Sequence, residues 1–194
     1  MRHYGRLESY IGYGPPVMME EGEIMTEQAR YNRAGQGLIM GIDPGPTESA
    51  YAIVRPDYTL ISAAKVSNQD MRERIADSEF SRTYVIESLA CYGRPVGRET
   101  FETAYMVGAY REIAQRKGQC ILYDRPTYAN AIAGTNRVTD AMLYQALRLR
   151  FGPATKGGPL YGLRGNSDLR SAYALAVFHL DCLARPAQAR KGSR

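Results

Sequence analysis

The chain has 194 residues, of which 44% are hydrophobic and 23% charged, and its formal net charge is +5. This length favours one domain that is large enough to bury a core, and the composition is ordinary for a globular protein. The longest apolar runs are far shorter than the roughly 20 residues of a membrane helix, and the N-terminus lacks a signal-peptide core. We therefore expect a cytoplasmic protein with no membrane partner. The positive charge weakly favours a polyanionic partner.

The three cysteines, Cys91, Cys120 and Cys182, are far apart, and no C-x-x-C pair is present. Only two histidines could join them in a zinc site. We therefore expect reduced thiols rather than disulfides or structural zinc.

Residues 1–36 differ from the rest of the chain. They contain Pro15-Pro16 and a cluster of glutamates but no clean hydrophobic period. We predict an N-terminal extension that is partly disordered or draped over the domain. One domain then spans residues 37–184, and the basic residues 185–194 form a C-terminal tail.

The domain begins with three predicted strands joined by short turns, which indicates an antiparallel meander: 38–43, 49–54 and 58–66. A polar stretch, 67–81, precedes a fourth strand at 82–87 and a loop at 88–98. Apolar residues at helical spacing predict three helices, with a short strand at 119–123 after the first: 99–117, 139–151 and 167–184. The helix at 99–117 has its inward face on roughly one side, which carries Phe101, Ala104, Tyr105, Gly108, Ala109 and Ile113. Ser167 is the predicted N-cap of the last helix. This alternation of strands and helices predicts an α/β fold.

Three carboxylates stand at informative places in this pattern. Asp43 ends the first apolar strand, directly before Pro44-Gly45, and Glu87 ends the fourth. Asp168 lies in the first turn of the last helix. Acids so close to a sheet interior usually have a cation or donor as partner, and three hard oxygen ligands suit Mg²⁺ or Mn²⁺. Taken singly, Asp43 could instead form the turn, and Asp168 could favour its helix N-terminus.

Three motifs occur in a fixed order along the chain: Gly41-Ile42-Asp43-Pro44-Gly45, Tyr84-Val85-Ile86-Glu87, and the segment from Ser167 to Val177 that continues to His179. Together they resemble the RuvC-type Holliday-junction resolvases of the ribonuclease H-like (retroviral integrase) superfamily. The stretch 134–153 looks like the small branch encoded by phages and prophages. The resemblance covers residues 38–184. It implies a five-stranded mixed sheet flanked by helices, with the first and fourth strands side by side and the last helix crossing them.

The resemblance also implies an activity, which is the resolution of four-way DNA junctions by paired symmetric nicks. Asp43, Glu87 and Asp168 would be the catalytic residues and would hold two Mg²⁺ ions, for which Mn²⁺ could substitute. One ion would activate water and the other would stabilise the leaving 3′ oxygen. The enzyme would be a homodimer, because symmetric nicks need two equivalent sites. It would need no nucleotide cofactor, and it would act in the host cytoplasm if a phage encodes it.

The last helix departs from the family in one respect. The final helix of the family often carries two acids, or a histidine and an aspartate, three residues apart. Here Asp168 occupies the first of these positions and Ser171 the second. Ser171 could offer a hydroxyl or hold a metal-bound water, but it cannot supply the missing charge. Either three carboxylates suffice, or another acid such as Asp140 approaches. Alternatively, Ser171 is a small packing residue, and Asp140 is an ordinary acid in the first turn of its helix.

Two regions carry the predicted DNA contacts. The loop after Glu87 contains an aromatic residue that could stack on an opened base, although the family has its aromatic nearer the catalytic glutamate and a tyrosine packed under its own loop is the alternative. Basic residues beside the other acids would contact phosphates. The predicted DNA-binding residues are Tyr92, Arg94, Arg98, Arg137, Lys156, Arg164 and Arg170.

Three other functions stay open from the sequence. The nuclease could act more broadly on branched DNA or on an RNA–DNA hybrid. Ser171 raises the alternative of a catalytically inactive junction-binding protein. A phosphotransferase of the actin and sugar-kinase group also has an Ile-Asp-x-Gly strand, but that architecture needs two such domains and this chain has room for one.

Overall fold

The structure is a computed structural model and describes residues 37–78, 83–90, 93 and 95–184. All of them belong to one compact unit, residues 34–194. The predicted extension over 1–36 and the predicted tail over 185–194 lie outside the described residues, as does Cys91. Among the residues described, Cys120 and Cys182 form no disulfide.

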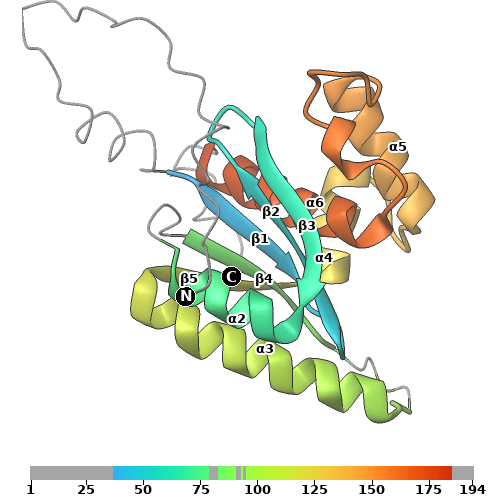
Figure 1. The fold of residues 1–194 in the computed structure, drawn as a ribbon. Coiled ribbons are helices and arrows are strands. Elements are labelled where there is room, and N and C mark those ends of the chain that lie inside the picture. Colours follow the sequence, from blue (N-terminus) through green and yellow to red (C-terminus); the bar gives the residue numbers. More distant parts are fainter. Residues whose placement is uncertain (1–36, 79–82, 91–92, 94, 185–194) are drawn as a thin grey trace, which may run out of the picture. The chain divides into compact units, whose positions relative to one another are not determined.

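The centre of the domain is a five-stranded mixed sheet, shown in Figure 1, with the order β3-β2-β1-β4-β5. β1 pairs antiparallel with β2, and β2 with β3, whereas β1, β4 and β5 run parallel. This confirms the predicted α/β class, the antiparallel meander and the neighbouring positions of the first and fourth strands. The strands are β1 (Ile39–Asp43), β2 (Glu48–Val54), β3 (Leu60–Ser67), β4 (Thr83–Ser88) and β5 (Gln119–Asp124).

Helices cover both faces of this sheet (Figure 1). α2 and α3 lie on one face, and α6 crosses the other face beside α4 and α5. A short 3₁₀ helix, η1, packs near the start of β3. The helical elements are α2 (Asn68–Ala76), α3 (Arg98–Lys117), α4 (Arg125–Ala133), α5 (Asp140–Phe151), η1 (Tyr161–Leu163) and α6 (Ser167–Ala184).

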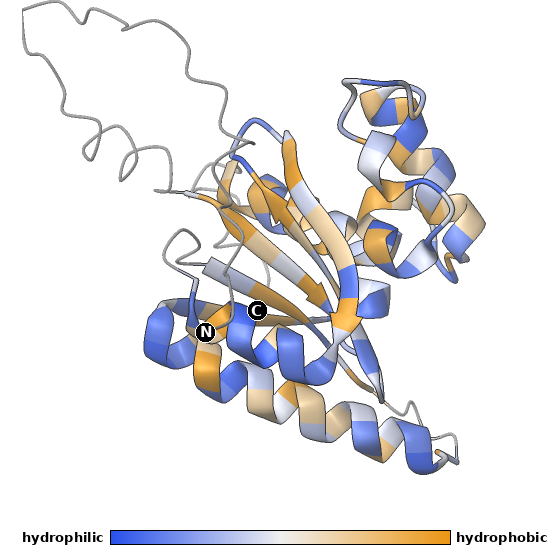
Figure 2. Ribbon diagram, viewed as in Figure 1, coloured by the Kyte–Doolittle hydropathy of each residue, from blue (hydrophilic) through white to orange (hydrophobic). Residues whose placement is uncertain are grey.

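Successive side chains of β1 point to opposite faces, and this alternation divides the core in two. Ile39 packs with the residues of α4, α5 and α6, while Met40 and Ile42 pack with those of α2 and α3. Figure 2 shows β1 as largely hydrophobic, α2 as largely hydrophilic and α3 as a mixture of both. The strand is buried on both faces, which explains its continuous apolar sequence.

Gly41 lets α6 approach β1 closely. A Cβ atom on Gly41 would stand 2.0 Å from the backbone oxygen of Ala172, so only glycine fits at this point of the strand. The crossing of α6 over the central strands is therefore confirmed, and it depends on the glycine of the first motif. Asp168 and Ser171 lie at the start of this helix, before the residue that contacts Gly41.

Two helices were not predicted. α2 lies within the stretch 67–81, which was predicted to be polar. The helix was missed because only Met71 and Ile75 of its nine residues are buried, so its apolar period is weak. α4 follows β5 directly, with Asp124 as its N-cap: the carboxylate accepts a hydrogen bond from the Thr127 backbone N–H at 3.1 Å. Pro126, at the start of α4, is compatible with the first turn of a helix.

Two local details of the prediction were wrong. Asn166 caps α6 instead of Ser167, because its side chain accepts the backbone N–H groups of Asp168 and Leu169 at 2.9 and 3.3 Å. The expected inward face of α3 is also displaced. Phe101 and Tyr105 are 53% and 69% exposed, and the helix buries its other side through Thr103, Tyr110 and Ala114.

Candidate active site

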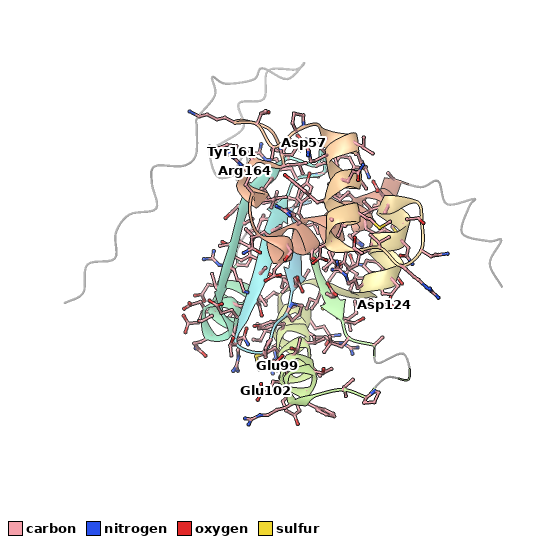
Figure 3. The ribbon with its side chains drawn as sticks, turned by 90° about the vertical axis from the view of Figure 1, so that its right-hand side faces the viewer. Asp57, Glu99, Glu102, Asp124, Tyr161 and Arg164 are labelled. Atoms are coloured by element: carbon pink, nitrogen blue, oxygen red, sulfur yellow. The ribbon has the colours of Figure 1, made fainter. Side chains whose placement is uncertain are left out.

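Acidic residues stand at the same end of the three parallel strands. Asp43 and Glu87 directly follow the paired residues Ile42 and Ile86, at the ends of β1 and β4. Asp124 ends the neighbouring strand β5, and Figure 3 labels it at the start of α4. Open α/β sheets usually bind ligands at the carboxyl ends of their strands. This end of the sheet is therefore the candidate site.

Asp43 is the acid with the least compensation. No hydrogen bond or ion pair joins its carboxylate to the residues that the structure describes. Burial raises its pKa well above the ordinary 3.8, and the negative charges of Glu87 and Asp168 raise it further. Arg125 opposes this shift only in part. A cation that binds beside a desolvated carboxylate without a protein partner gains more electrostatic free energy than one that binds beside a paired carboxylate.

Glu87 is held by a buried tyrosine. The hydroxyl of Tyr128, a fully buried residue of α4, donates a hydrogen bond to Oε2 of Glu87 at 2.7 Å. Burial raises the pKa of Glu87, and the hydrogen bond from Tyr128 and the charge of Arg125 counteract that rise. The pKa of Tyr128 is itself strongly raised by burial and then by the charge of Glu87, so its hydroxyl keeps its proton and serves as a donor.

Arg125 connects the acids to the last helix. Its Nη1 donates to the Tyr128 hydroxyl at 3.1 Å and to Oγ of Ser171 at 3.0 Å, and its Nη2 forms an ion pair with Asp140. Desolvation lowers the pKa of this guanidinium, but Tyr128, Glu87 and the other neighbouring acids raise it by more. Arg125 is thus a permanent cation within the acidic group.

Asp168 also has a cation as its partner. Nζ of Lys65, on β3, lies 2.9 Å from Oδ2 of Asp168 and 3.9 Å from Oε2 of Glu48. The Ser167 hydroxyl donates to Oδ1 of Asp168 at 3.1 Å. Lys65 lies opposite Ala50 in the sheet, and Ala50 lies opposite Asp43, which puts the pair at the candidate site.

The donor set fits a hard divalent cation, although the side chains do not already form a cage. Within the described part of the chain, no group of three or more histidine, cysteine, aspartate or glutamate side chains could hold a metal ion. Glu87, Asp140 and Asp168 each have a protein donor instead. Mg²⁺ is usually bound through one or two carboxylates, with water and substrate phosphate supplying the other ligands. Asp43 and Glu87 would suffice for that.

The predicted site residues are distributed as follows. Asp43, Glu87, Asp168 and Asp140 interact electrostatically, so the structure brings the four acids into one neighbourhood. Ser171 is 3% exposed and accepts a hydrogen bond from Arg125. The role of each of these residues in catalysis or metal binding stays a prediction.

The predicted DNA-binding residues do not all lie at this site. Arg137 lines a cavity of about 600 Å³ together with Glu87. Arg98 is exposed at the start of α3 and pairs with Glu102. Arg164 lies over the ring of Tyr161, and Figure 3 shows both near the β2–β3 turn, away from Asp124.

The remaining predicted contacts differ in their surroundings. Lys156 is exposed in the loop after α5. Nε of Arg170 donates to the Leu163 backbone oxygen at 3.2 Å, and its guanidinium lies 3.8 Å from the ring centre of Tyr144, so this arginine holds the loop against α5. Tyr92 and Arg94 lie outside the described residues.

Four residues of the site were missed from the sequence: Lys65, Asp124, Arg125 and Tyr128. One signal was available for three of them. Asp124-Arg125-Pro126 follows an apolar strand directly, which is a pattern for a capped helix at the carboxyl end of a strand, and Tyr128 lies three residues after Arg125 on the same helical face. Nothing in the sequence distinguishes Lys65 from other lysines.

Comparison with known proteins supports the fold. No protein-family model matches the sequence, and no curated protein matches it. Among solved structures, the chain is similar to RuvC of Thermus thermophilus, with a TM-score of 0.59 and 18% identity over 73% of this chain and 92% of RuvC. It is similar to T. thermophilus RuvC in complex with a Holliday junction substrate, with a TM-score of 0.58 and 17% identity over 74% and 93% of the two chains. This likeness confirms the predicted ribonuclease H-like fold.

Proposed function

We propose that this protein is a divalent-metal-dependent endonuclease that resolves four-way DNA junctions by paired symmetric nicks. The observation that carries the proposal is the carboxylate of Asp43, which has no hydrogen-bond or ion-pair partner among the described residues and lies beside Glu87, at the carboxyl ends of adjacent parallel strands. The similarity to RuvC supports a junction-resolving nuclease, since one of the similar structures contains a Holliday junction.

The chemistry follows from the donors at this end of the sheet. Asp43 and Glu87 would hold Mg²⁺ or Mn²⁺, which when bound polarises a phosphate oxygen and lowers the pKa of a water molecule. Tyr128 orients Glu87 by donating to Oε2. Lys65 keeps Asp168 at the site and limits the repulsion between the carboxylates. Arg137, on the wall of the cavity that includes Glu87, would contact a phosphate of the DNA.

A homodimer would supply the two active sites that symmetric nicks need. Support comes from α3, on which the large apolar side chains of Phe101 and Tyr105 are mostly exposed. Sedimentation of the full chain and of Tyr105→Lys tests this part of the proposal. A monomeric wild-type protein at the concentrations used for cleavage would contradict it.

The origin and location of the protein are less constrained. Membership of the phage or prophage branch rests on the motif at 134–153 alone, and location in a host cytoplasm depends on that origin, so both stay predictions. In the described part of the chain, every helix is too short or too polar to cross a membrane.

The test is cleavage of a labelled four-way junction by the full chain, with Mg²⁺ or Mn²⁺ and with EDTA. A linear duplex and an RNA–DNA hybrid serve as competing substrates. We expect symmetric nicks in the junction only, which Asp43→Asn abolishes and Asp57→Asn does not. Asp57 is the matched control because it is an exposed aspartate that Figure 3 shows at a distance from Asp124. Preferred cleavage of the hybrid or of other branched DNA would contradict the junction substrate.

Ser171 favours a second candidate, a protein that binds junctions without cutting them. The buried hydroxyl of Ser171 cannot replace the charge of the missing acid, and Arg125 already uses it as an acceptor. Tight junction binding without cleavage in either metal would support this alternative against the nuclease.

A further inference from the structure

The turn that follows Asp43 is held by one side chain from another element. Asn68, the first residue of α2, donates from Nδ2 to the backbone oxygens of Gly45 and Pro46 at 3.0 and 3.1 Å. Its backbone N–H donates to the backbone oxygen of Thr47 at 3.1 Å. Asn68 therefore binds three successive residues of the turn between β1 and β2.

The oxygen of the same amide contacts two hydroxyl groups. Oδ1 of Asn68 lies 2.7 Å from Oγ of Ser49, on β2, and 2.9 Å from the hydroxyl oxygen of Tyr110, on α3. These two hydroxyls are 2.9 Å apart, and the backbone N–H of Gly45 donates to Oγ of Ser49 at 3.2 Å. Ser49 is 1% exposed and Tyr110 is fully buried. Because buried polar groups are costly to leave unpaired, these contacts fix the Asn68 cluster, which consists of Asn68, Ser49 and Tyr110.

The Asn68 cluster lies on the face of the sheet opposite to the carboxylate of Asp43. Side chains alternate along a strand, and Ile42 packs with α2 and α3, so Asp43 points to the face that α6 covers. On β2, Ala50 pairs with Asp43 and packs on the α6 face, so its neighbour Ser49 points towards Tyr110. The cluster thus supports the turn from behind the candidate site.

Asp43 depends on the backbone more than the other two predicted catalytic acids do. Glu87 and Asp168 each have a protein donor, whereas no hydrogen bond or ion pair joins the carboxylate of Asp43 to the described residues. The position of Asp43 therefore follows from the backbone of β1 and of the turn after it. That turn is the segment that Asn68 binds.

We infer that Asn68, together with Ser49 and Tyr110, positions Asp43 for the divalent cation. This inference rests on the proposed metal-dependent function and adds to it three positioning residues, which act through the backbone and do not contact the cation. Removal of such an outer partner typically reduces metal affinity or activity by about 10–100-fold. We therefore expect Asn68→Ala to raise the dissociation constant for Mn²⁺ by about 10-fold.

The test follows the turn and the cation separately, in the full chain without DNA. Amide hydrogen exchange at Gly45, measured by nuclear magnetic resonance, reports on the turn, because this N–H donates to Ser49. The electron paramagnetic resonance signal of free Mn²⁺ gives the dissociation constant. We expect faster exchange at Gly45 and weaker Mn²⁺ binding in Asn68→Ala, and a smaller change in the same direction in Tyr110→Phe.

Two control variants match these substitutions. Gln69→Ala removes the neighbouring side chain of α2, which donates to Glu73 and not to the turn. Tyr84→Phe removes the hydroxyl of another fully buried tyrosine, which packs in the same half of the core but lies outside the Asn68 cluster. Both controls should keep the wild-type exchange at Gly45 and the wild-type dissociation constant. Thermal unfolding verifies that each variant is folded at the temperature of the titration.

The outcomes separate this inference from the proposed function. A folded Asn68→Ala protein with wild-type exchange at Gly45, or with wild-type Mn²⁺ affinity, would overturn the inference even if the protein cleaves junctions. If Asn68→Ala does not fold, the same two measurements on Tyr110→Phe decide. No Mn²⁺ binding by the wild type would overturn both proposals. The expected changes in a protein that leaves junctions uncut would refute the nuclease and support the positioning role.

Discussion

Gly41→Ala is the most direct test of how the fold assembles the site. The added methyl group would stand 2.0 Å from the Ala172 oxygen, and Cβ contacts below 3.0 Å essentially never occur, so β1 and α6 must separate by at least 1 Å (3.0 − 2.0). Overpacking of this kind costs about 1–3 kcal/mol. Since 1 kcal/mol changes Tm by about 2–4 °C in a chain of this size, we expect Tm to fall by about 2–12 °C.

The same displacement should damage catalysis more than binding. α6 carries Asp168 and Ser171 at its start, and a misplacement of 1 Å can reduce a rate by about 10²-fold. Calorimetry, junction cleavage and junction binding measure the three effects. The matched control is Gly108→Ala on α3, where the added Cβ meets nothing within 4 Å and the helix should gain about 0.5–1 kcal/mol. A Gly41→Ala protein with wild-type Tm and cleavage would refute the close approach of α6.

Four further predictions concern the site. Asp43→Asn, Glu87→Gln and Asp168→Asn should each reduce cleavage by orders of magnitude and change junction affinity by no more than a few-fold; a variant with normal cleavage removes its residue from the site. Tyr128→Phe leaves Glu87 without its donor and should reduce the free energy of unfolding in urea by about 1.5–3 kcal/mol, and an unchanged midpoint would contradict this. Because the pKa of Asp43 is raised, the folded protein keeps a proton on this carboxyl at pH values at which the unfolded chain has lost it. The free energy of unfolding of the metal-free protein should therefore fall as the pH rises above about 4, and it should fall less steeply in Asp43→Asn. Arg137→Ala should weaken binding to junction and duplex alike and lower the salt slope by about one unit; an effect on the junction alone would argue against a phosphate contact.

The sequence was sufficient for the elements that have strong local signals. The five strands and the helices α3, α5 and α6 were predicted within two residues at each end, because each has a clear period or a clear turn. α2 was missed because just two of its residues reach the core. The inward face of α3 was wrong for a related reason: the helix exposes Phe101 and Tyr105 and buries Thr103, which reverses the usual preference.

Four acids of the site were predicted from the sequence, and the contacts with their partners were not. Asp43 and Glu87 each end an apolar strand, so the local pattern identifies them. The local pattern at Asp124-Arg125-Pro126 could have indicated the helix that carries Arg125, but the contacts of Lys65 with Asp168 and of Arg125 with Ser171 join distant parts of the chain. A sequence pattern with a period of two or 3.6 residues contains no information on such contacts.

The arrangement of partners explains how this site can exist before any ion binds. Four carboxylates so close together would repel one another in a desolvated environment. Arg125 and Lys65 compensate Asp140 and Asp168, and Tyr128 stabilises the charge of Glu87. Asp43 alone is left with a strongly raised pKa and without a protein donor among the described residues. The unfavourable charge is thus concentrated on one side chain, and a cation that binds there removes the largest electrostatic cost in the site.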